Sequence, residues 1–302
     1  MNTTQAIKQA AIGDTGPVAG QALLPAPATP AEAAKYQRLR SHMAYLNLPA
    51  AAEALPAVLD AAREEDLSAL EAIERLLAIQ VSATATRRQE SNLKFACLPA
   101  TWSIDDYDFE AQPGVDEKLI RELASLRFLD DATNVIFIGP PGVGKTMLSI
   151  GLARAAALAG HRTYFTTCED LVRRLRRAIV EHRFNTGLRF FTQPKLLVID
   201  EFGYRNLDED GRSLLFEVIN GRYLKGSVIT TAHVGIAAWA ERLGDPMLAA
   251  ALIDRLLHRG IIVAIDGPSY RMRAHQAHAE ALRRATRPTG GKAKTTASGA
   301  AP

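Results

Sequence analysis

The spacing of hydrophobic residues divides the chain into a helical region and a region of alternating strands and helices. From Lys35 to about Asn92, leucine and isoleucine recur every three or four residues, which predicts a small all-helical domain. Farther along, five short runs rich in β-branched residues alternate with helical patterns: 135–138, 163–166, 196–199, 228–231 and 261–265. This alternation predicts an α/β fold, a parallel sheet sandwiched by helices on both faces.

Changes of composition along the chain predict five segments. Residues 1–32 are rich in Ala, Pro and Thr without periodicity, which indicates a disordered leader. The helical domain follows at 33–95, a linker with prolines and acids at 96–117, and the α/β domain at 118–273. The remaining segment, 274–302, carries five Lys or Arg residues and one Glu, so it is either a solvated extension or a tether for nucleic acid.

Overall composition excludes several classes of protein. The 302 residues are 47% hydrophobic and 23% charged with a net charge of +3, as in an ordinary globular protein. No apolar run approaches the roughly 20 residues that span a bilayer, and the N-terminus lacks the apolar core of a signal peptide, so we expect a cytoplasmic protein without membrane contact. Cys97 and Cys168 have no metal-binding or redox spacing, and we expect two buried free thiols.

A glycine-rich loop stands between the first predicted strand and the helix after it. It has the GxxxxGK[ST] pattern of a phosphate loop, in the strand–loop–helix context that such a loop requires. We expect backbone N–H groups of the loop to surround the β-phosphate, Lys145 to reach the β- and γ-phosphates, and the Thr146 hydroxyl to bind Mg²⁺. The residues that we predict to bind the nucleotide are Gly139, Pro140, Pro141, Gly142, Val143, Gly144, Lys145, Thr146 and Met147.

The third predicted strand ends in two adjacent acids, Asp200 and Glu201. Two carboxylates at the end of a buried strand repel each other, and a phosphate-bound Mg²⁺ would relieve that repulsion. We predict that Asp200 holds the metal and that Glu201 activates the attacking water. This pair favours an ATPase with ATP and Mg²⁺ as cofactors over a phosphotransferase, for which the sequence shows no acceptor-binding signature.

Two other positions are candidates for catalysis. Thr231 and His233 lie at the tip of the fourth strand, where a polar side chain can contact the γ-phosphate or the water, although a lone His is more often a surface residue. Arg255, near the end of a helical pattern, is either a surface charge or an arginine finger that completes the site of a neighbouring subunit.

Four arginines crowd one predicted helix: Arg173, Arg174, Arg176 and Arg177. Like charges at this spacing repel one another, so an anionic partner would stabilise the helix. We interpret these residues as contacts to DNA phosphates, with a merely solvated face as the alternative.

Together these residues give the chain a clear family resemblance. It resembles the IstB-like transposition helper ATPases, a branch of the AAA+ proteins that also contains helicase loaders and replication initiators. The resemblance covers about residues 35–273. The motifs GPPGVGKT (139–146) and LLVIDEFGY (196–204) are shared by many ATPases, whereas GDPMLAAALIDRLLH (244–258) and GPSYRMR (267–273) are more discriminating.

The resemblance implies a P-loop AAA+ module behind a helical N-terminal domain, without a C-terminal lid domain. It implies a homo-oligomer that forms on duplex DNA in the ATP state and recruits or stimulates the transposase encoded beside it. Arg255 matches the family's trans-acting arginine, and His233 stands where the family usually has Asn. Two alternatives stay open: a helicase-loader-type ATPase in replication, and an ATP-gated DNA-binding module with little hydrolysis.

Overall fold

The computed structural model describes residues 29–203, 207–239, 241, 244–270 and 272. The chain divides into two compact units, Met1–Thr86 and Arg87–Pro302. Most of the expected leader, all of the basic tail and the place of any C-terminal lid lie outside the described residues. Within those residues, no helix has the length and apolar character needed to cross a membrane.

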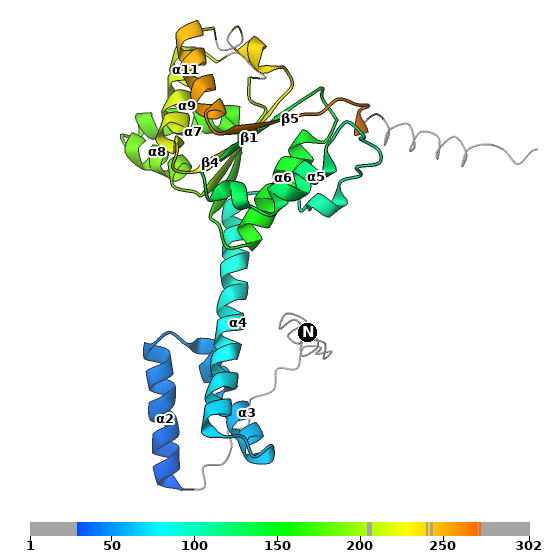
Figure 1. Ribbon diagram of the computed structural model, residues 1–302. Helices are drawn as coiled ribbons and strands as arrows, with labels where there is room; N and C mark the ends of the chain where they lie inside the picture. Colours follow the sequence, from blue (N-terminus) through cyan, green and yellow to red (C-terminus); the bar gives the residue numbers. More distant parts are fainter. Residues whose placement is uncertain (1–28, 204–206, 240, 242–243, 271, 273–302) are drawn as a thin grey trace, which may run out of the picture. The chain divides into compact units, whose positions relative to one another are not determined.

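The N-terminal unit is built from helices α2 (Pro30–Tyr45) and α3 (Pro49–Glu64) and from the first part of α4 (Ala69–Ala96) (Figure 1). Its small core contains Met43, Ala51, Leu55, Val58 and Leu76. Helix α2 begins inside the segment 1–32 that we expected to be a leader. The Thr29 side chain accepts a hydrogen bond from the amide of Glu32, and a proline occupies the first helical position, so this stretch carries its own start signal.

The second unit contains the predicted parallel sheet, and this prediction is confirmed. Its strand order is β2-β3-β4-β1-β5, and every neighbouring pair is parallel. The strands are β1 (Asn134–Ile138), β2 (Thr163–Thr167), β3 (Leu196–Asp200), β4 (Ser227–Ala232) and β5 (Gly260–Ala264).

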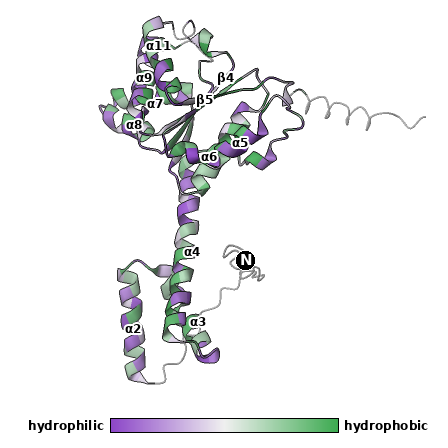
Figure 2. Cartoon of the chain, viewed as in Figure 1, coloured by the Kyte–Doolittle hydropathy of each residue, from purple (hydrophilic) through white to green (hydrophobic). Residues whose placement is uncertain are grey.

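Helices cover both faces of the sheet because successive strand residues point to opposite sides. Val135 and Phe137 belong to one apolar cluster, with residues of α5 (Glu117–Ala124) and α6 (Lys145–Leu158), whereas Ile136 belongs to another. That second cluster includes residues of α7 (Cys168–Val180), α8 (Phe184–Thr192), α9 (Glu209–Arg222) and α11 (Pro246–Leu257). The covering helices carry both hydrophobic and hydrophilic residues (Figure 2). Three short 3-10 helices complete the described elements: η1 (Ile104–Asp106), η2 (Arg127–Leu129) and η3 (Ile236–Ala238).

The segment 96–117, which we expected to be a linker, is part of the α/β unit. Ile104, Tyr107 and Val115 are buried in the same cluster as β1 and α6. Prolines and acids interrupt the helical periodicity here. The buried apolar residues therefore follow no regular spacing from which the sequence could predict that they pack against the sheet. The expectation for the thiols also needs a correction, because Cys168 is buried but Cys97 is exposed.

Candidate functional site

The phosphate loop joins β1 to α6 at the carboxyl edge of the sheet. Gly142 and Gly144 have left-handed backbone, with φ of +88° and +97°. A Cβ atom at Gly142 would collide with the Ser269 side chain, and one at Gly144 would collide with the Tyr107 ring. Both positions therefore require glycine for their backbone angles and for the close approach of a neighbour.

Two segments far away in the sequence hold the loop in this shape. The Tyr107 hydroxyl donates to the carbonyl of Val143 at 2.9 Å, and the amide of Tyr270 donates to the carbonyl of Gly142 at 2.8 Å. Sequence reasoning missed both contacts. Tyr107 stood in an expected linker, and Tyr270 entered only as part of the family motif.

Lys145 begins α6, and its ammonium group is almost fully buried, with 4% of the residue exposed. Its Nζ donates to the carbonyls of Gly139 and Pro140, both at 2.7 Å, and lies 3.2 Å from Nδ1 of His233. An ammonium group can only donate, so Nδ1 accepts and the proton of a neutral His233 ring is on Nε2. The structure thus brings together two of the predicted catalytic residues, from β1's loop and from the end of β4.

The predicted metal ligands also lie together. Thr146 Oγ1 is 3.1 Å and 3.2 Å from the two carboxylate oxygens of Asp200, a residue that is 7% exposed. The hydroxyl of Thr231 also donates to Asp200. Hydroxyl and carboxylate oxygens are hard ligands that suit Mg²⁺, which usually takes one or two carboxylates beside phosphate oxygens. The residues present therefore fit a Mg²⁺–nucleotide complex.

Glu201 follows β3 in a strained backbone conformation. Its φ is +58°, which costs a non-glycine residue about 1–2 kcal/mol. Its amide donates to Thr231 Oγ1 at 3.1 Å, and the residue is exposed. Strain held in place by surrounding contacts is typical of functional positions. Thr231, which we weighed at the strand tip but left out of the predicted site, connects Asp200 to Glu201 through a single hydroxyl.

Arg255 lies on α11 and is held by residues of α9. Its Nε donates to Asn220 Oδ1 at 3.0 Å, and its guanidinium lies 4.7 Å from the centre of the Phe216 ring. A further N–H donates to the carbonyl of Ala251 in its own helix. These contacts of Arg255 are separate from the phosphate loop of the same chain.

The four arginines of α7 are exposed, but each has a partner within the chain. Three of them pair with carboxylates: Arg173 with Asp170, Arg176 with Asp208, and Arg177 with Glu181. Arg174 donates to the Tyr164 hydroxyl. The argument from uncompensated repulsion therefore does not hold, because acids of the same chain already offset the charge of three of the four arginines.

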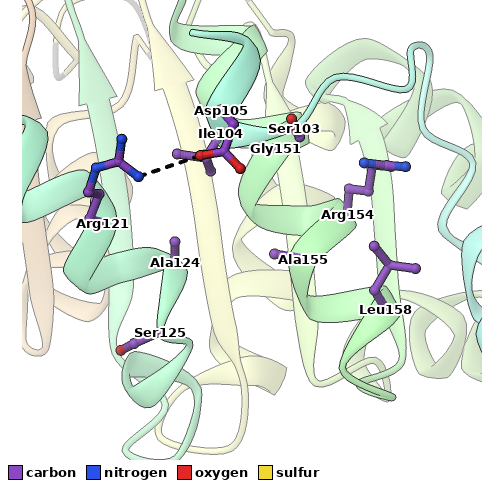
Figure 3. A pocket seen from close by; sticks show the side chains of 10 residues that line it. All are labelled: Ser103, Ile104, Asp105, Arg121, Ala124, Ser125, Gly151, Arg154, Ala155 and Leu158. Carbon is purple, nitrogen blue, oxygen red and sulfur yellow. Dashed lines mark hydrogen bonds and ion pairs between the residues drawn. The ribbon is translucent and has the colours of Figure 1, made fainter. Parts of the chain in front are cut away.

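The described part of the chain also has hollows outside the phosphate loop, and one of about 630 Å³ is lined by residues of η3 and α11. A second, of about 460 Å³, is lined by Arg174, Arg177, Arg183 and Phe190 among others. Another, of about 340 Å³, lies between η1, α5 and α6 (Figure 3). In it the Arg121 side chain reaches Asp105 at 3.5 Å, and none of the predicted site residues lines it.

Comparison with known proteins agrees with a nucleotide-binding site at this loop. The family model described as IstB-like ATP binding protein matches residues 41–278. The chain belongs to this family. An insertion-sequence protein of Geobacillus stearothermophilus, named for IS5376 and for ATP binding, is 41% identical over 78% of this chain and 94% of its own length. The corresponding IS21 protein of Pseudomonas aeruginosa is 40% identical over 72% of this chain and 82% of its own length.

Solved structures give weaker likenesses. A DnaC helicase loader has a TM-score of 0.44 and 27% identity, over 49% of this chain and 86% of that chain. DnaA from Aquifex aeolicus bound to AMPPCP has a TM-score of 0.48 and 18% identity, over 62% of this chain and 57% of that chain. The predicted IstB-like resemblance is confirmed by the family match and the insertion-sequence relatives, and this chain is a member of an ATP-binding family.

Proposed function

We propose that this IstB-like protein is a cytoplasmic, Mg²⁺-dependent ATPase that assembles into a homo-oligomer on duplex DNA and recruits or stimulates the transposase of its insertion sequence. The observation that carries the proposal is the cluster of Thr146, Asp200 and Thr231 beside the buried Lys145. The names of the insertion-sequence relatives support the link to transposition.

The chain's own residues divide the work of hydrolysis. Bound Mg²⁺–ATP supplies the phosphoryl group and the charge that the site must stabilise. Thr146 and Asp200 would hold the metal, and Lys145 would exchange a loop carbonyl for a phosphate oxygen. His233 Nδ1 orients the ammonium group of Lys145. Glu201 would take a proton from the attacking water. The hydrogen bond from its amide to Thr231 Oγ1 holds the backbone from which the Glu201 side chain extends.

Hydrolysis is tested with Lys145→Ala and Glu201→Gln. We expect Lys145→Ala to lose nucleotide binding, because it removes the cation that meets the phosphates. We expect Glu201→Gln to bind ATP normally while turnover falls by about a hundredfold or more, since a general base contributes about 10²–10⁴ in rate. Normal turnover in Glu201→Gln would contradict the role of the glutamate. Binding without turnover in the unmodified protein would instead favour the ATP-gated module.

Assembly is tested by sedimentation and DNA binding with ATP, ADP or a slowly hydrolysed analogue, on duplex and single-stranded DNA. Large complexes on duplex that require the triphosphate and disappear in Lys145→Ala would support the proposal. Monomers that ignore the nucleotide would contradict it. A clear preference for single strands would also contradict it and would favour a helicase loader.

The proposed role of α7 in DNA binding is tested by replacing an arginine of the helix and, separately, the carboxylate that pairs with it. Exposed ion pairs contribute only about 0–1 kcal/mol, so a DNA phosphate can replace Glu181 beside Arg177. If these arginines contact DNA, Glu181→Gln should strengthen duplex binding, and Arg177→Ala should weaken it and flatten its salt dependence. Glu117→Gln, at an exposed i,i+4 pair with Arg121 on another helix, is the matched control. Unchanged DNA affinity in both α7 variants would remove this helix from the interface.

The role of Arg255 between subunits is tested by mixing two inactive variants. Arg255→Ala keeps an intact phosphate loop and Glu201, whereas Glu201→Gln keeps Arg255. If Arg255 acts on a neighbouring subunit, the mixture should recover part of the ATPase activity that each variant lacks alone. Arg259→Ala, which removes an exposed arginine bonded to the carbonyl of Asp131, is the control and should stay active. Absence of recovery in mixed oligomers would contradict the role in trans.

A further inference from the structure

The hollow between η1, α5 and α6 combines an apolar lining with two arginines. Its volume is about 340 Å³, at the lower end of pockets that hold small ligands. Arg121 belongs to α5 and Arg154 to α6, and Figure 3 shows the two side chains on opposite sides of the hollow. Most other lining residues are small or apolar: Ile104, Ala124, Gly151, Ala155 and Leu158. A recess of this size accommodates individual side chains of a partner.

The two arginines differ in their contacts within the chain. Arg121 Nε donates to Glu117 at 2.7 Å, and a terminal nitrogen of Arg121 lies 3.5 Å from Asp105. Arg154 is half-buried, and it makes no hydrogen bond or ion pair with any residue that the structure describes. Its charge acts on Asp106 through space, but that carboxylate already accepts from the amide and hydroxyl of Ser103. Arg154 therefore lines the hollow with a guanidinium that lacks an acceptor in the described part of the chain.

A partner that covers the apolar lining would also remove water from Arg154. A guanidinium that loses its water needs an acceptor in exchange, and a carboxylate suits it best because both carboxylate oxygens can accept from the planar fork. DNA phosphates suit the hollow less well. The acids Asp105, Asp106 and Glu117 already balance the two arginines, so the region lacks the excess of positive charge by which proteins bind DNA. The charges therefore fit one carboxylate between apolar side chains, not an anionic polymer.

The sequence beside the hollow has a further feature of a protein interface. Trp102 directly precedes the lining residue Ser103 and is 42% exposed, whereas the other tryptophan of the chain, Trp239, is 1% exposed. Tryptophan and arginine are enriched among the residues that carry most of the binding energy of protein–protein interfaces. An exposed tryptophan next to a half-buried arginine therefore favours a polypeptide as the occupant.

The wall formed by η1 is joined to the phosphate loop. Ile104 packs so closely on α6 that a Cβ atom at Gly151 would lie 2.7 Å from its side chain. The Ile104 carbonyl accepts from the amide of Tyr107 at 3.1 Å, and the Tyr107 hydroxyl holds the Val143 carbonyl of the loop. A partner in the hollow thus contacts the segment that braces the nucleotide site. This connection suits a partner that is recruited in the ATP state, since coupling between two ligands requires a shared element.

We propose that this hollow is the docking site for the transposase of the insertion sequence, which inserts an apolar segment whose single Asp or Glu pairs with Arg154. The inference rests on the transposase recruitment proposed above and names the surface that performs it. Arg154 gives the contact its specificity, because a segment without the carboxylate would leave the covered guanidinium without an acceptor. The apolar residues between the two arginines supply the buried area.

The first test measures the affinity of the full chain for the purified transposase by calorimetry, without DNA, with ADP or a slowly hydrolysed ATP analogue. We expect Arg154→Glu to weaken binding by about tenfold or more, because the variant removes the donor and places two carboxylates against each other. Arg259→Glu, which reverses an exposed arginine outside the hollow, is the matched control and should bind normally.

The outcomes separate this inference from the proposed function. Unchanged transposase affinity in a folded Arg154→Glu protein would overturn the docking site and leave recruitment intact. If the unmodified protein binds no transposase with either nucleotide, even after duplex DNA is added, the proposed recruitment itself fails. Loss of self-assembly in Arg154→Glu with normal transposase affinity would assign the hollow to a second copy of the chain and would also overturn the inference.

The second test fills the hollow without changing its charge. Ala124→Phe adds a ring to the lining from α5, and Lys118→Phe adds the same ring to an exposed position of α5 outside the lining. We expect Ala124→Phe to weaken transposase binding at least as much as Arg154→Glu does, while Lys118→Phe binds normally. Thermal unfolding and ATP binding show whether each variant keeps its fold. Normal transposase affinity in a folded Ala124→Phe protein would overturn the proposal.

Discussion

Two adjacent threonines of β4 give the sharpest test of the site, because they occupy opposite faces of the sheet. Thr231 Oγ1 donates to the Asp200 carboxylate and accepts from the Glu201 amide at 3.1 Å. Thr230 is 0% exposed, and its Oγ1 has no hydrogen-bond partner among the described residues. Thr→Val preserves the shape and the β-branch at both positions and removes only the hydroxyl. The two variants therefore differ in hydrogen bonding and in little else.

The expected changes in the free energy of unfolding have opposite signs. Thr231→Val loses one hydrogen bond to a charged group, about 1.5–3 kcal/mol, and one between neutral groups, about 0.5–1.5 kcal/mol. The sum predicts destabilisation by about 2–4.5 kcal/mol. Thr230→Val removes an unsatisfied buried hydroxyl whose desolvation costs about 1–3 kcal/mol, so this variant should be more stable by about 1 kcal/mol or more.

Urea unfolding followed by circular dichroism measures both values, and nucleotide binding separates stability from function. In Thr231→Val the Asp200 carboxylate loses a partner that orients it, and such partners affect metal affinity by about 10–100-fold. We expect a loss of that order in Mg²⁺-dependent ATP binding. Thr230→Val should bind normally. Equal destabilisation by the two variants, or normal Mg²⁺–ATP binding in Thr231→Val, would refute the reasoning.

Three other predictions concern Arg222, His233 and Cys168. The guanidinium of Arg222 is 1% exposed and donates to five backbone carbonyls between Phe191 and Ser227. Arg222→Met leaves buried carbonyls without their donor and should cost about 1–3 kcal/mol or more, measured by urea unfolding; a loss below about 1 kcal/mol would contradict that role. His233→Asn keeps an acceptor for the Lys145 ammonium and should retain ATP hydrolysis, whereas His233→Leu should lower it about tenfold in a steady-state assay. Burial raises the pKa of the Cys168 thiol to about 12, so one thiol per chain should react with a disulfide reagent at neutral pH before unfolding and two afterwards.

The strands and the phosphate-binding residues could be predicted from the sequence, because short stretches of neighbouring residues identify them. The five strands were predicted to within one residue at each end, because continuous β-branched runs between glycines and charges are typical of buried parallel strands. The phosphate loop and the Asp200–Glu201 pair lie at strand ends, and the carboxyl ends of parallel strands meet at one edge of the sheet. Topology alone therefore brings Thr146 close to Asp200.

What could not be predicted depends on residues that are far apart in the chain. Nothing in the sequence near Gln112 indicates that its buried side chain donates to the carbonyl of Pro268, 156 residues away, and the prolines around the glutamine favoured a linker. Arg222 likewise has no local feature that distinguishes it from the surface arginines. In both cases the decisive fact is burial, which only the packing of separate segments determines.

The arginines of α7 show how a correct local observation led to an incomplete argument. Four arginines within one helix do repel one another. The carboxylates that offset this repulsion, however, include Asp208, which lies 32 residues from its partner Arg176. The sequence of the helix alone therefore showed only some of the acids that neutralise it. The consequence reaches the proposed DNA interface itself. Three of these arginines are already paired with acids of the same chain, so DNA must compete with those acids. The net affinity that these three contribute is the difference between two sets of weak ion pairs. Useful affinity from such contacts requires many copies of the helix on one duplex, which is what a homo-oligomer supplies and what a monomer cannot.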